Sequence, residues 1–299
     1  MASNFRIIPP PRDQQETSSY RSVWNSIIIE LSILTIICGL IFIPKFLIGF
    51  SLPVSIHSYV NLALVLTPTI VWLGFSYLKE RSVPQPRRRL LGVFIISILT
   101  ANAIGIPLVE GLLQLETWLS HETAFMRIFG YTVAYGVIHM GLIYLVQRYT
   151  VWATDYRNRL DVVAYCLTAA IAYVSVINFH YFLGYEVSPD VMAIRLLSNM
   201  AMFIGGSLFL SYGIALTYFD NALSPVMPIY VFVSAFIAGG LIPIRSGLAN
   251  AGLSTTISTT KPLLVFAFSI GILFICLSLI MFLFNSKEHR EAERLKTGL

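Results

Sequence analysis

Ionisable side chains inside long apolar runs are the positions from which this chain could do chemistry, because burying a charge in a bilayer is costly. Five residues have this character: Glu30, Glu110, His139, Asp161 and His180. Three polar residues accompany them in the same runs: Asn102, Asn178 and Asn199. Carboxylates and imidazoles bind metals and transfer protons, so these residue types point to metal binding, proton relay or structural pairing.

A metal site requires three or four ligands that converge on one point. Glu110 and His180 each lie three residues from the outer end of an expected span, so both are expected at one level, and Glu186 follows in the outer loop. These three residues are candidates for a divergent metal site. We favour a simpler interpretation, a histidine bonded to a helix neighbour beside solvated loop carboxylates, and so predict no resident metal.

His139 stands alone in its span. It lies about 15 residues from the outer end, roughly 18 Å deeper than Glu110 and His180, and is too far away to share a metal with them. An isolated membrane histidine is a candidate ligand for a tetrapyrrole or a proton relay. A second histidine at equal depth is missing, so we favour a core histidine that donates to a backbone carbonyl or an asparagine.

The other two acidic residues have simpler interpretations. Glu30 lies two turns into its span, where it either pairs with Arg21 or faces water. Asp161 begins a span beside Arg157 and Arg159, which favours a local ion pair. No catalytic residue is predicted, because the sequence contains no HExxH, GxSxG, Walker A or GxGxxG motif and its three cysteines lack CxxC spacing.

The composition defines the elements that must position these side chains. Of the 299 residues, 56% are hydrophobic and 12% are charged, and the mean hydropathy is +0.75. Such values exclude a soluble globular domain and indicate an all-α transmembrane helix bundle, for which no nucleic-acid partner is expected. Windows of about 20 apolar residues, the length that crosses a bilayer core, predict eight spans. They are 24–48, 56–78, 90–113, 124–145, 162–183, 196–218, 226–244 and 262–284.

The distribution of charge predicts how these spans are oriented. If both termini are cytoplasmic, the inner segments carry 15 of the 20 Lys and Arg residues, as the positive-inside rule requires. We therefore expect a multi-pass protein of a bacterial cytoplasmic membrane with both ends inside. Residues 1–23 are expected to form a polar arm, 24–285 the membrane domain, and 286–299 a charged tail that extends the last helix.

Small residues in two spans predict close helix packing. The fourth span contains Gly136 and Gly141, and the seventh contains Gly239 and Gly240. Glycines let helix backbones approach one another in a membrane. We therefore expect tight helix contacts at these positions rather than a substrate path.

Several polar and aromatic residues follow one another in a defined order in the fifth and sixth spans. Asp161 and Tyr165 are four residues apart, Asn178 and Tyr181 are three apart, and Arg195 follows them. This order resembles the framework of the PrsW family of intramembrane metalloproteases. The likeness covers residues 135–244 and implies a protease-like helical core.

The metal ligands of that family are replaced in this chain. His139 and Met140 stand where a pair of acids belongs, Ile177 stands at another Glu position, and a histidine position falls near Phe203. A zinc site needs its acids and imidazoles, and a carboxylate must also activate the attacking water. The resemblance therefore implies a pseudoenzyme, a protease-like scaffold without protease chemistry.

Three functions remain open. The first is a non-catalytic scaffold or membrane-complex subunit that binds a membrane protein or a lipid and needs no metal or tetrapyrrole. The second is a metal-dependent hydrolase built on Glu110, His180 and Glu186. The third is a proton-coupled transporter that uses Glu30, Glu110 and His139. We favour the first.

Overall fold

The computed structural model describes residues 15–81, 87–151, 155–220, 225–250 and 261–297, without the side chains of 15–22, 249–250, 261 and 288–297. Within these residues every regular element is a helix, and eight helical segments are long and apolar enough to cross a membrane. The predicted helical bundle is confirmed, and these eight segments correspond to the eight predicted spans.

The second, third and fourth spans contain short π-helical segments, which are named η together with one 3₁₀ turn, η1. The elements are α1 (Gln15–Ile48), η1 (Val54–Ile56), α2 (His57–Val71), η2 (Trp72–Tyr77), α3 (Leu78–Arg81), α4 (Leu90–Thr100), η3 (Ala101–Gly105), η4 (Pro107–Leu113), α5 (Leu115–Leu119), α6 (Ala124–Gly130), η5 (Tyr131–Gly136) and α7 (Val137–Thr150). Helix α1 begins inside the predicted polar arm, of which residues 1–14 lie outside the described residues.

The last four spans include three long helices. The elements are α8 (Arg159–Gly184), α9 (Pro189–Phe219), α10 (Val226–Ala235), the π-helical η7 (Phe236–Gly240), α11 (Leu241–Asn250) and α12 (Lys261–Thr297). Helix α12 continues through most of the predicted charged tail, so the expected helical extension is confirmed as far as Thr297.

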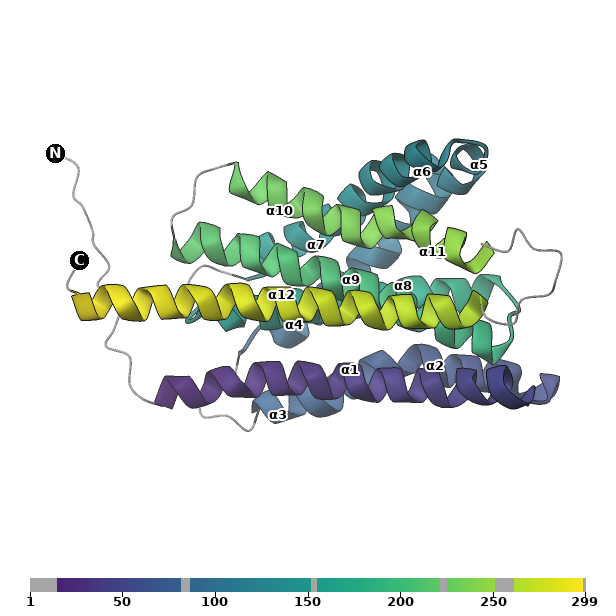
Figure 1. Cartoon of the computed structure of the whole chain (residues 1–299), viewed down its shortest axis with the longest axis horizontal. Helices are drawn as coiled ribbons and strands as arrows, with labels where there is room; N and C mark the ends of the chain where they lie inside the picture. Colours follow the sequence, from purple (N-terminus) through teal and green to yellow (C-terminus); the bar gives the residue numbers. More distant parts are fainter. Residues whose placement is uncertain (1–14, 82–86, 152–154, 221–224, 251–260, 298–299) are drawn as a thin grey trace.

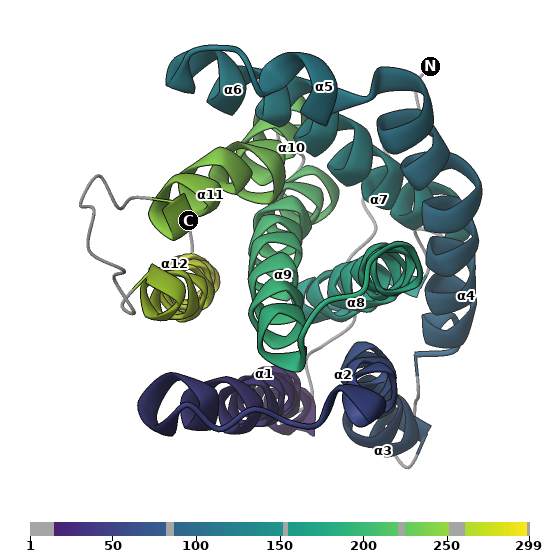
Figure 2. The ribbon, with the colours of Figure 1, turned by 90° about the vertical axis from the view of Figure 1, so that its right-hand side faces the viewer.

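Helices α8 and α9 occupy the centre of the bundle, with the other spans around them (Figure 2). Both are buried over most of their length, whereas the six surrounding spans bury only a minority of theirs. The outer faces carry large exposed apolar side chains such as Leu40, Leu99 and Phe274, as expected for a surface that meets lipid.

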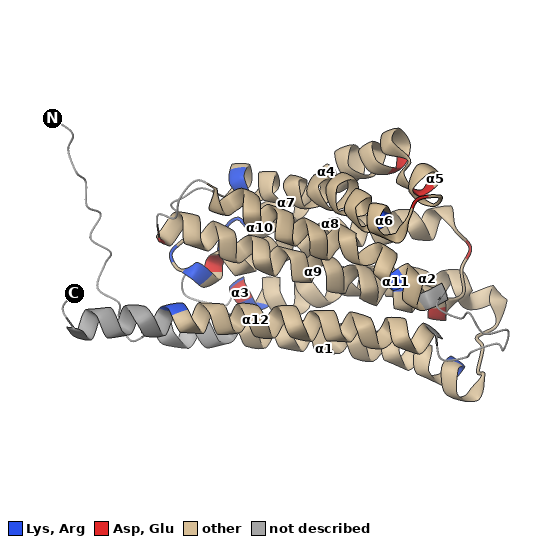
Figure 3. Ribbon diagram, turned by 45° about the horizontal axis from the view of Figure 1, so that its top comes forward, with Lys and Arg blue, Asp and Glu red and all other residues tan. Residues whose placement is uncertain are grey.

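Charged residues gather at the two ends of the bundle (Figure 3). Helix α1 begins and α12 ends at one of them, which we call the basic end, while α5, α6 and α11 lie towards the opposite end (Figure 1). At the basic end Asp220, which caps α9, pairs with Arg159 of α8 and, at 3.2 Å, with Lys287 of α12. At the opposite end Lys45 lies 2.6 Å from Asp190 and joins α1 to α9.

Close packing between the fourth and seventh spans occurs where η5 meets η7. A Cβ placed on Gly136 would lie 2.7 Å from the carbonyl carbon of Ala235, and one on Gly239 would lie 2.7 Å from the backbone nitrogen of Gly136. A Cβ on Gly141 would meet no atom of the described residues within 4 Å. The prediction of tight contacts is thus confirmed for Gly136 and Gly239 and wrong for Gly141.

Candidate functional site

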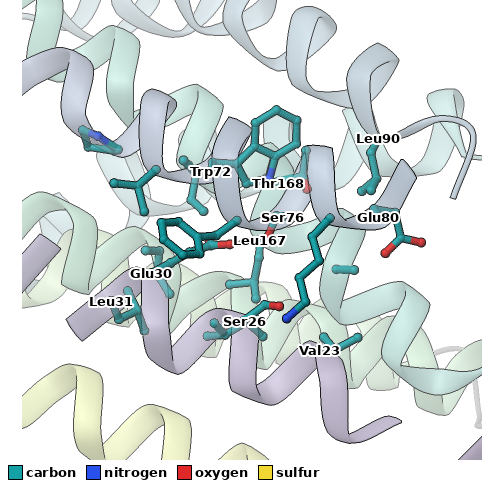
Figure 4. A pocket seen from close by; sticks show the side chains of 18 of the residues that line it. Val23, Ser26, Glu30, Leu31, Trp72, Ser76, Glu80, Leu90, Leu167 and Thr168 are labelled. Carbon is teal, nitrogen blue, oxygen red and sulfur yellow. Dashed lines mark hydrogen bonds between the residues drawn. The ribbon is translucent and has the colours of Figure 1, made fainter. Parts of the chain in front are cut away.

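A cavity of about 250 Å³ lies between α1, the second span, α8 and α9, near the basic end (Figure 4). Along α1 its lining runs from Val23 to Leu34, about 16 Å of helix, which is close to half of the roughly 30 Å hydrocarbon thickness of a bilayer. The apolar part of the lining includes Leu34, Pro68, Leu167, Ile171, Met200 and Ile204. The cavity therefore has the length of one leaflet and mostly apolar walls.

Most of the polar side chains that line this cavity come from α1 and the second span. Ser26 and Glu30 are four residues apart on α1, and Ser76 and Glu80 are four apart on the second span. Residues at this spacing share one helix face, so each pair forms a short polar stripe. The Ser76 hydroxyl donates to Oε1 of Glu30, and Figure 4 shows the two side chains pointing towards one another.

The environment of Glu30 corrects one expectation. Its side chain is buried, with 7% exposed, so it does not face bulk water. Its observed partner, Ser76, comes from the second span, and the side chain of Arg21 lies outside the described residues. A carboxyl group is thus presented to the inside of the cavity.

Arg87 lies at the basic end of the cavity lining and joins two acidic residues. Its Nη1 is 2.6 Å from Oε2 of Glu80, and its Nε is 2.6 Å from Oδ1 of Asp161. Asp161 also forms a capping box with Asn158 at the start of α8. These contacts tie the connection before α4 to the first turn of α8.

The ion pair of Asp161 differs from the one expected from the sequence. Asp161 accepts a hydrogen bond of 2.9 Å from the backbone N–H of Arg157, but its guanidinium partner is Arg87, 74 residues earlier in the chain. Arg159 instead pairs with Asp220. The expected local ion pair is therefore wrong, because the fold brings Arg87, from the connection before α4, within 2.6 Å of Asp161.

Trp72 forms one wall of the cavity. Its ring stacks on Phe94 with centroids 4.3 Å apart, and its Nε1–H donates to Oγ1 of Thr168 over 3.2 Å. The side chain is 2% exposed. This wall is consequently fixed from both sides, and a ligand would meet a preformed surface.

Apolar walls, a short polar stripe and an ion-paired end are the chemistry of an amphiphile site. An acyl chain fits the apolar part, and a hydroxyl or ammonium group can hydrogen-bond to the Glu30 carboxyl. In the sequence, only the Ser26–Glu30 pair in an apolar run points to this site, because Trp72 and Thr168 come from distant spans.

The candidate metal ligands meet only in part. Nε2 of His180 lies 3.2 Å from Oε2 of Glu110, as expected for two residues at one level, and both side chains are about half exposed. Glu186 does not join them: among the described residues, no three His, Cys, Asp or Glu side chains gather as potential metal ligands. The pair has the geometry of a solvated histidine–carboxylate contact.

His139 lies in the packed core between α7 and α8. Its Nδ1 is 2.8 Å from the hydroxyl oxygen of Tyr173, and the Tyr135 ring meets it edge-on at 4.2 Å. It is a buried core histidine, as we favoured, but its partner is a tyrosine rather than a carbonyl or an asparagine. The residues of the transporter hypothesis each have a different partner, because Glu30 bonds Ser76 and Glu110 contacts His180.

The framework residues of the PrsW resemblance fall into two groups, one at the start of α8 and one between the end of α8 and the beginning of α9. Asp161 and Tyr165 lie at its basic end, where the Tyr165 ring packs edge-on against Tyr156 at 6.0 Å. Asn178, Tyr181 and Arg195 lie together towards the opposite end: the Arg195 guanidinium stacks 3.5 Å above the Tyr181 ring, and Asn178 bonds Asn199.

Comparison with known proteins yields no relative of this chain. No protein-family model, no curated protein and no solved structure matches it. A functional assignment therefore depends on the geometry of the chain itself.

Proposed function

We propose that this protein is a non-catalytic integral membrane protein that binds a lipid chain in the cavity between α1, the second span, α8 and α9. The observation that carries the proposal is the cavity itself, which extends over about the depth of one leaflet, has mostly apolar walls and holds the Glu30–Ser76 pair. The scaffold around it is proposed to be that of a PrsW-type protease whose metal ligands have been replaced, acting as a subunit of a membrane complex.

The apolar walls supply the affinity. An acyl chain that enters the cavity covers Leu34, Ile171 and Met200, and each buried methylene contributes about 0.8 kcal/mol when it leaves water. The polar stripe supplies orientation, because a hydroxyl or ammonium head group can hydrogen-bond to Glu30 and lies near the Arg87–Glu80 pair. A lipid would therefore enter with its chain towards the bundle centre.

The excess of Lys and Arg supports a cytoplasmic location of the basic end. The cavity would then open in the cytoplasmic leaflet of a bacterial membrane. The grouping of Asn178, Tyr181 and Arg195 between α8 and α9 supports the protease-like scaffold.

The fluorescence of Trp72 tests lipid binding directly. Substitution of Trp24, Trp118 and Trp152 by Phe leaves Trp72 as the sole tryptophan, inside the cavity wall and 2% exposed. A single-chain amphiphile brominated on its acyl chain, added in small amounts to the purified full-length chain in unlabelled lipid, is expected to quench Trp72 saturably. Bulk lipid does not contact a ring buried to this extent.

A matched pair of Ala→Phe variants tests whether the quencher binds inside the cavity. Ala164 lines the cavity, so Ala164→Phe fills it and is expected to remove at least most of the saturable quenching. Ala63 on α2 is exposed at the lipid-facing surface, so Ala63→Phe adds the same volume outside the cavity and should leave quenching unchanged. The proposal fails if Trp72 is not quenched, or if both variants are quenched like the parent.

A further inference from the structure

A second polar site lies between α8, α9 and α11, on the far side of the bundle centre from the cavity. Its members, which we call the arginine–asparagine cluster, are Asn178, Arg195, Asn199 and Arg245. Arg195 and Asn199 are one turn apart on α9, and Asn178 and Tyr181 are one turn apart on α8. The Asn178–Asn199 bond and the Arg195–Tyr181 stack therefore form successive layers between two antiparallel helices.

The hydrogen bonds of this cluster run in one direction. A guanidinium can only donate, and Nη1 of Arg245 donates to Oδ1 of Asn199 over 2.9 Å, which fixes the orientation of that amide. Asn199 must then present its Nδ2, which donates to Oδ1 of Asn178 over 2.7 Å. The chain of donors ends at Nδ2 of Asn178.

The side-chain groups of this cluster that have no hydrogen-bond partner are both N–H donors. Nδ2 of Asn178 and Nε of Arg195 are buried and have no hydrogen-bond partner in the described part of the chain, and the Asn178 side chain is 0% exposed. Buried polar groups are normally paired, so two unpartnered N–H groups in one cluster indicate an acceptor that the described residues do not supply.

The charge of the cluster is uncompensated as well. Arg245 donates to Asn199, one turn from Arg195 on α9, so the two guanidinium groups belong to the same cluster. No carboxylate forms an ion pair with either of them among the residues that the structure describes; Asp190 pairs with Lys45, and Glu110 with His180. Two partly buried positive charges beside unpartnered donors favour an anion.

The depth of the cluster limits where that anion comes from. Arg195 lies six residues after Pro189, where α9 begins, and Tyr181 lies three residues before Gly184, where α8 ends. These offsets correspond to about 9 Å and about 5 Å from the helix ends. The cluster is thus within reach of lipid head groups and of ions in solution.

We propose that the arginine–asparagine cluster binds a phosphate group, held by the Arg195 and Arg245 guanidinium groups and by Nδ2 of Asn178. The forked guanidinium matches phosphate oxygens, and the asparagine amide adds a neutral donor. The phosphate belongs either to a lipid head group or to free inorganic phosphate. This site is separate from the lipid-chain cavity, so either proposal can fail without the other.

Thermal unfolding of the delipidated full-length chain in dodecyl maltoside, a detergent without phosphate, tests the site. Inorganic phosphate is titrated against chloride at constant ionic strength, and a soluble short-chain phosphatidylglycerol is titrated in a second series. A saturable rise of the unfolding midpoint in the first series identifies free phosphate as a ligand. A rise in the second series alone identifies the head group.

Variants show whether the rise of the unfolding midpoint on addition of phosphate comes from this cluster. Arg195→Gln, Arg195→Lys and Arg245→Gln are expected to weaken the apparent affinity at least tenfold, with Arg195→Lys retaining the charge but losing the fork. Arg88→Gln removes an exposed arginine at the basic end and should respond like the parent. Equal responses in all of these variants would overturn the proposal.

Asn178→Asp is the decisive variant because it hardly changes the shape of the side chain. The new carboxylate would sit beside the arginines and replace the bound anion. The variant is expected to unfold at or above the parental midpoint without phosphate, and to show no rise in either series. A normal phosphate response in Asn178→Asp, or no response of the parent in both series, contradicts a phosphate site here.

Discussion

Nδ1 of His139 lies 2.8 Å from the hydroxyl oxygen of Tyr173, and Gly105 provides the space for this contact. A Cβ on Gly105 would overlap the Tyr173 hydroxyl and lie 3.3 Å from Nδ1 of His139. Segments η3, α7 and α8 meet at this point. Because the two polar groups satisfy each other inside a ring of aromatic side chains, the pair links α7 to α8, and η3 packs against it at Gly105.

Loss of the Tyr173 hydroxyl should destabilise the bundle. Tyr173→Phe leaves a buried imidazole nitrogen without its partner and is expected to lower the free energy of unfolding by about 1–3 kcal/mol. Tyr135→Phe is the control, because this ring also contacts His139, at 4.2 Å, but its hydroxyl donates no hydrogen bond within the described residues. Denaturant unfolding in mild detergent measures both, and equal losses would contradict a structural role of the His139–Tyr173 bond.

The space at Gly105 makes a second prediction. Gly105→Ala forces Tyr173 to move and is expected to cost about 1–3 kcal/mol, as overpacking of a core does. Gly92 lies in the same span, and a Cβ there meets no described atom within 4 Å. Gly92→Ala should be neutral or stabilise the protein by up to about 1 kcal/mol, because alanine favours helix. Opposite signs in one unfolding assay would support the assigned packing.

The spans could be predicted because length and hydropathy fix them, and the rise per residue placed Glu110 and His180 at one level, now seen as a contact of 3.2 Å. The central position of α8 and α9 could not be predicted. Lipid-facing and protein-facing helix surfaces are both apolar, so hydropathy does not distinguish a central span from a peripheral one.

The partners of side chains were harder to predict than the depth of each residue along its span. Glu30 bonds Ser76, 46 residues later, and Asp161 pairs with Arg87, 74 residues earlier, so neither partner follows from local spacing. The glycines show the same limit: Gly136 and Gly141 are alike in the sequence, and only the position of the seventh span makes Gly136 a close contact.

A double-mutant cycle tests the Arg87–Asp161 pair at the start of α8. The two side chains are 12% and 5% exposed, so Arg87→Gln and Asp161→Asn are expected to couple by about 1–3 kcal/mol in unfolding free energy. Arg89 and Asp155 form a neighbouring pair that is 34% and 24% exposed, and the same cycle there should give about 0.2–1 kcal/mol. Additive losses at Arg87 and Asp161 would show that their contact does not stabilise the protein.

The junction of η5 and η7 provides the sharpest test of the fold. Of two glycines in the fourth span, Gly136 lies at this junction and Gly141 lies outside it. Gly136→Ala pushes a methyl group into the backbone at Ala235, which cannot yield as a flexible side chain can, so a loss of about 1–3 kcal/mol or more is expected. Gly141→Ala, five residues later in the same span, enters open space and should cost nothing measurable or stabilise the helix. Unfolding midpoints of the two variants, measured in the same detergent, separate these outcomes. If Gly141→Ala proved as damaging as Gly136→Ala, the contact between the fourth and seventh spans would have to be placed elsewhere.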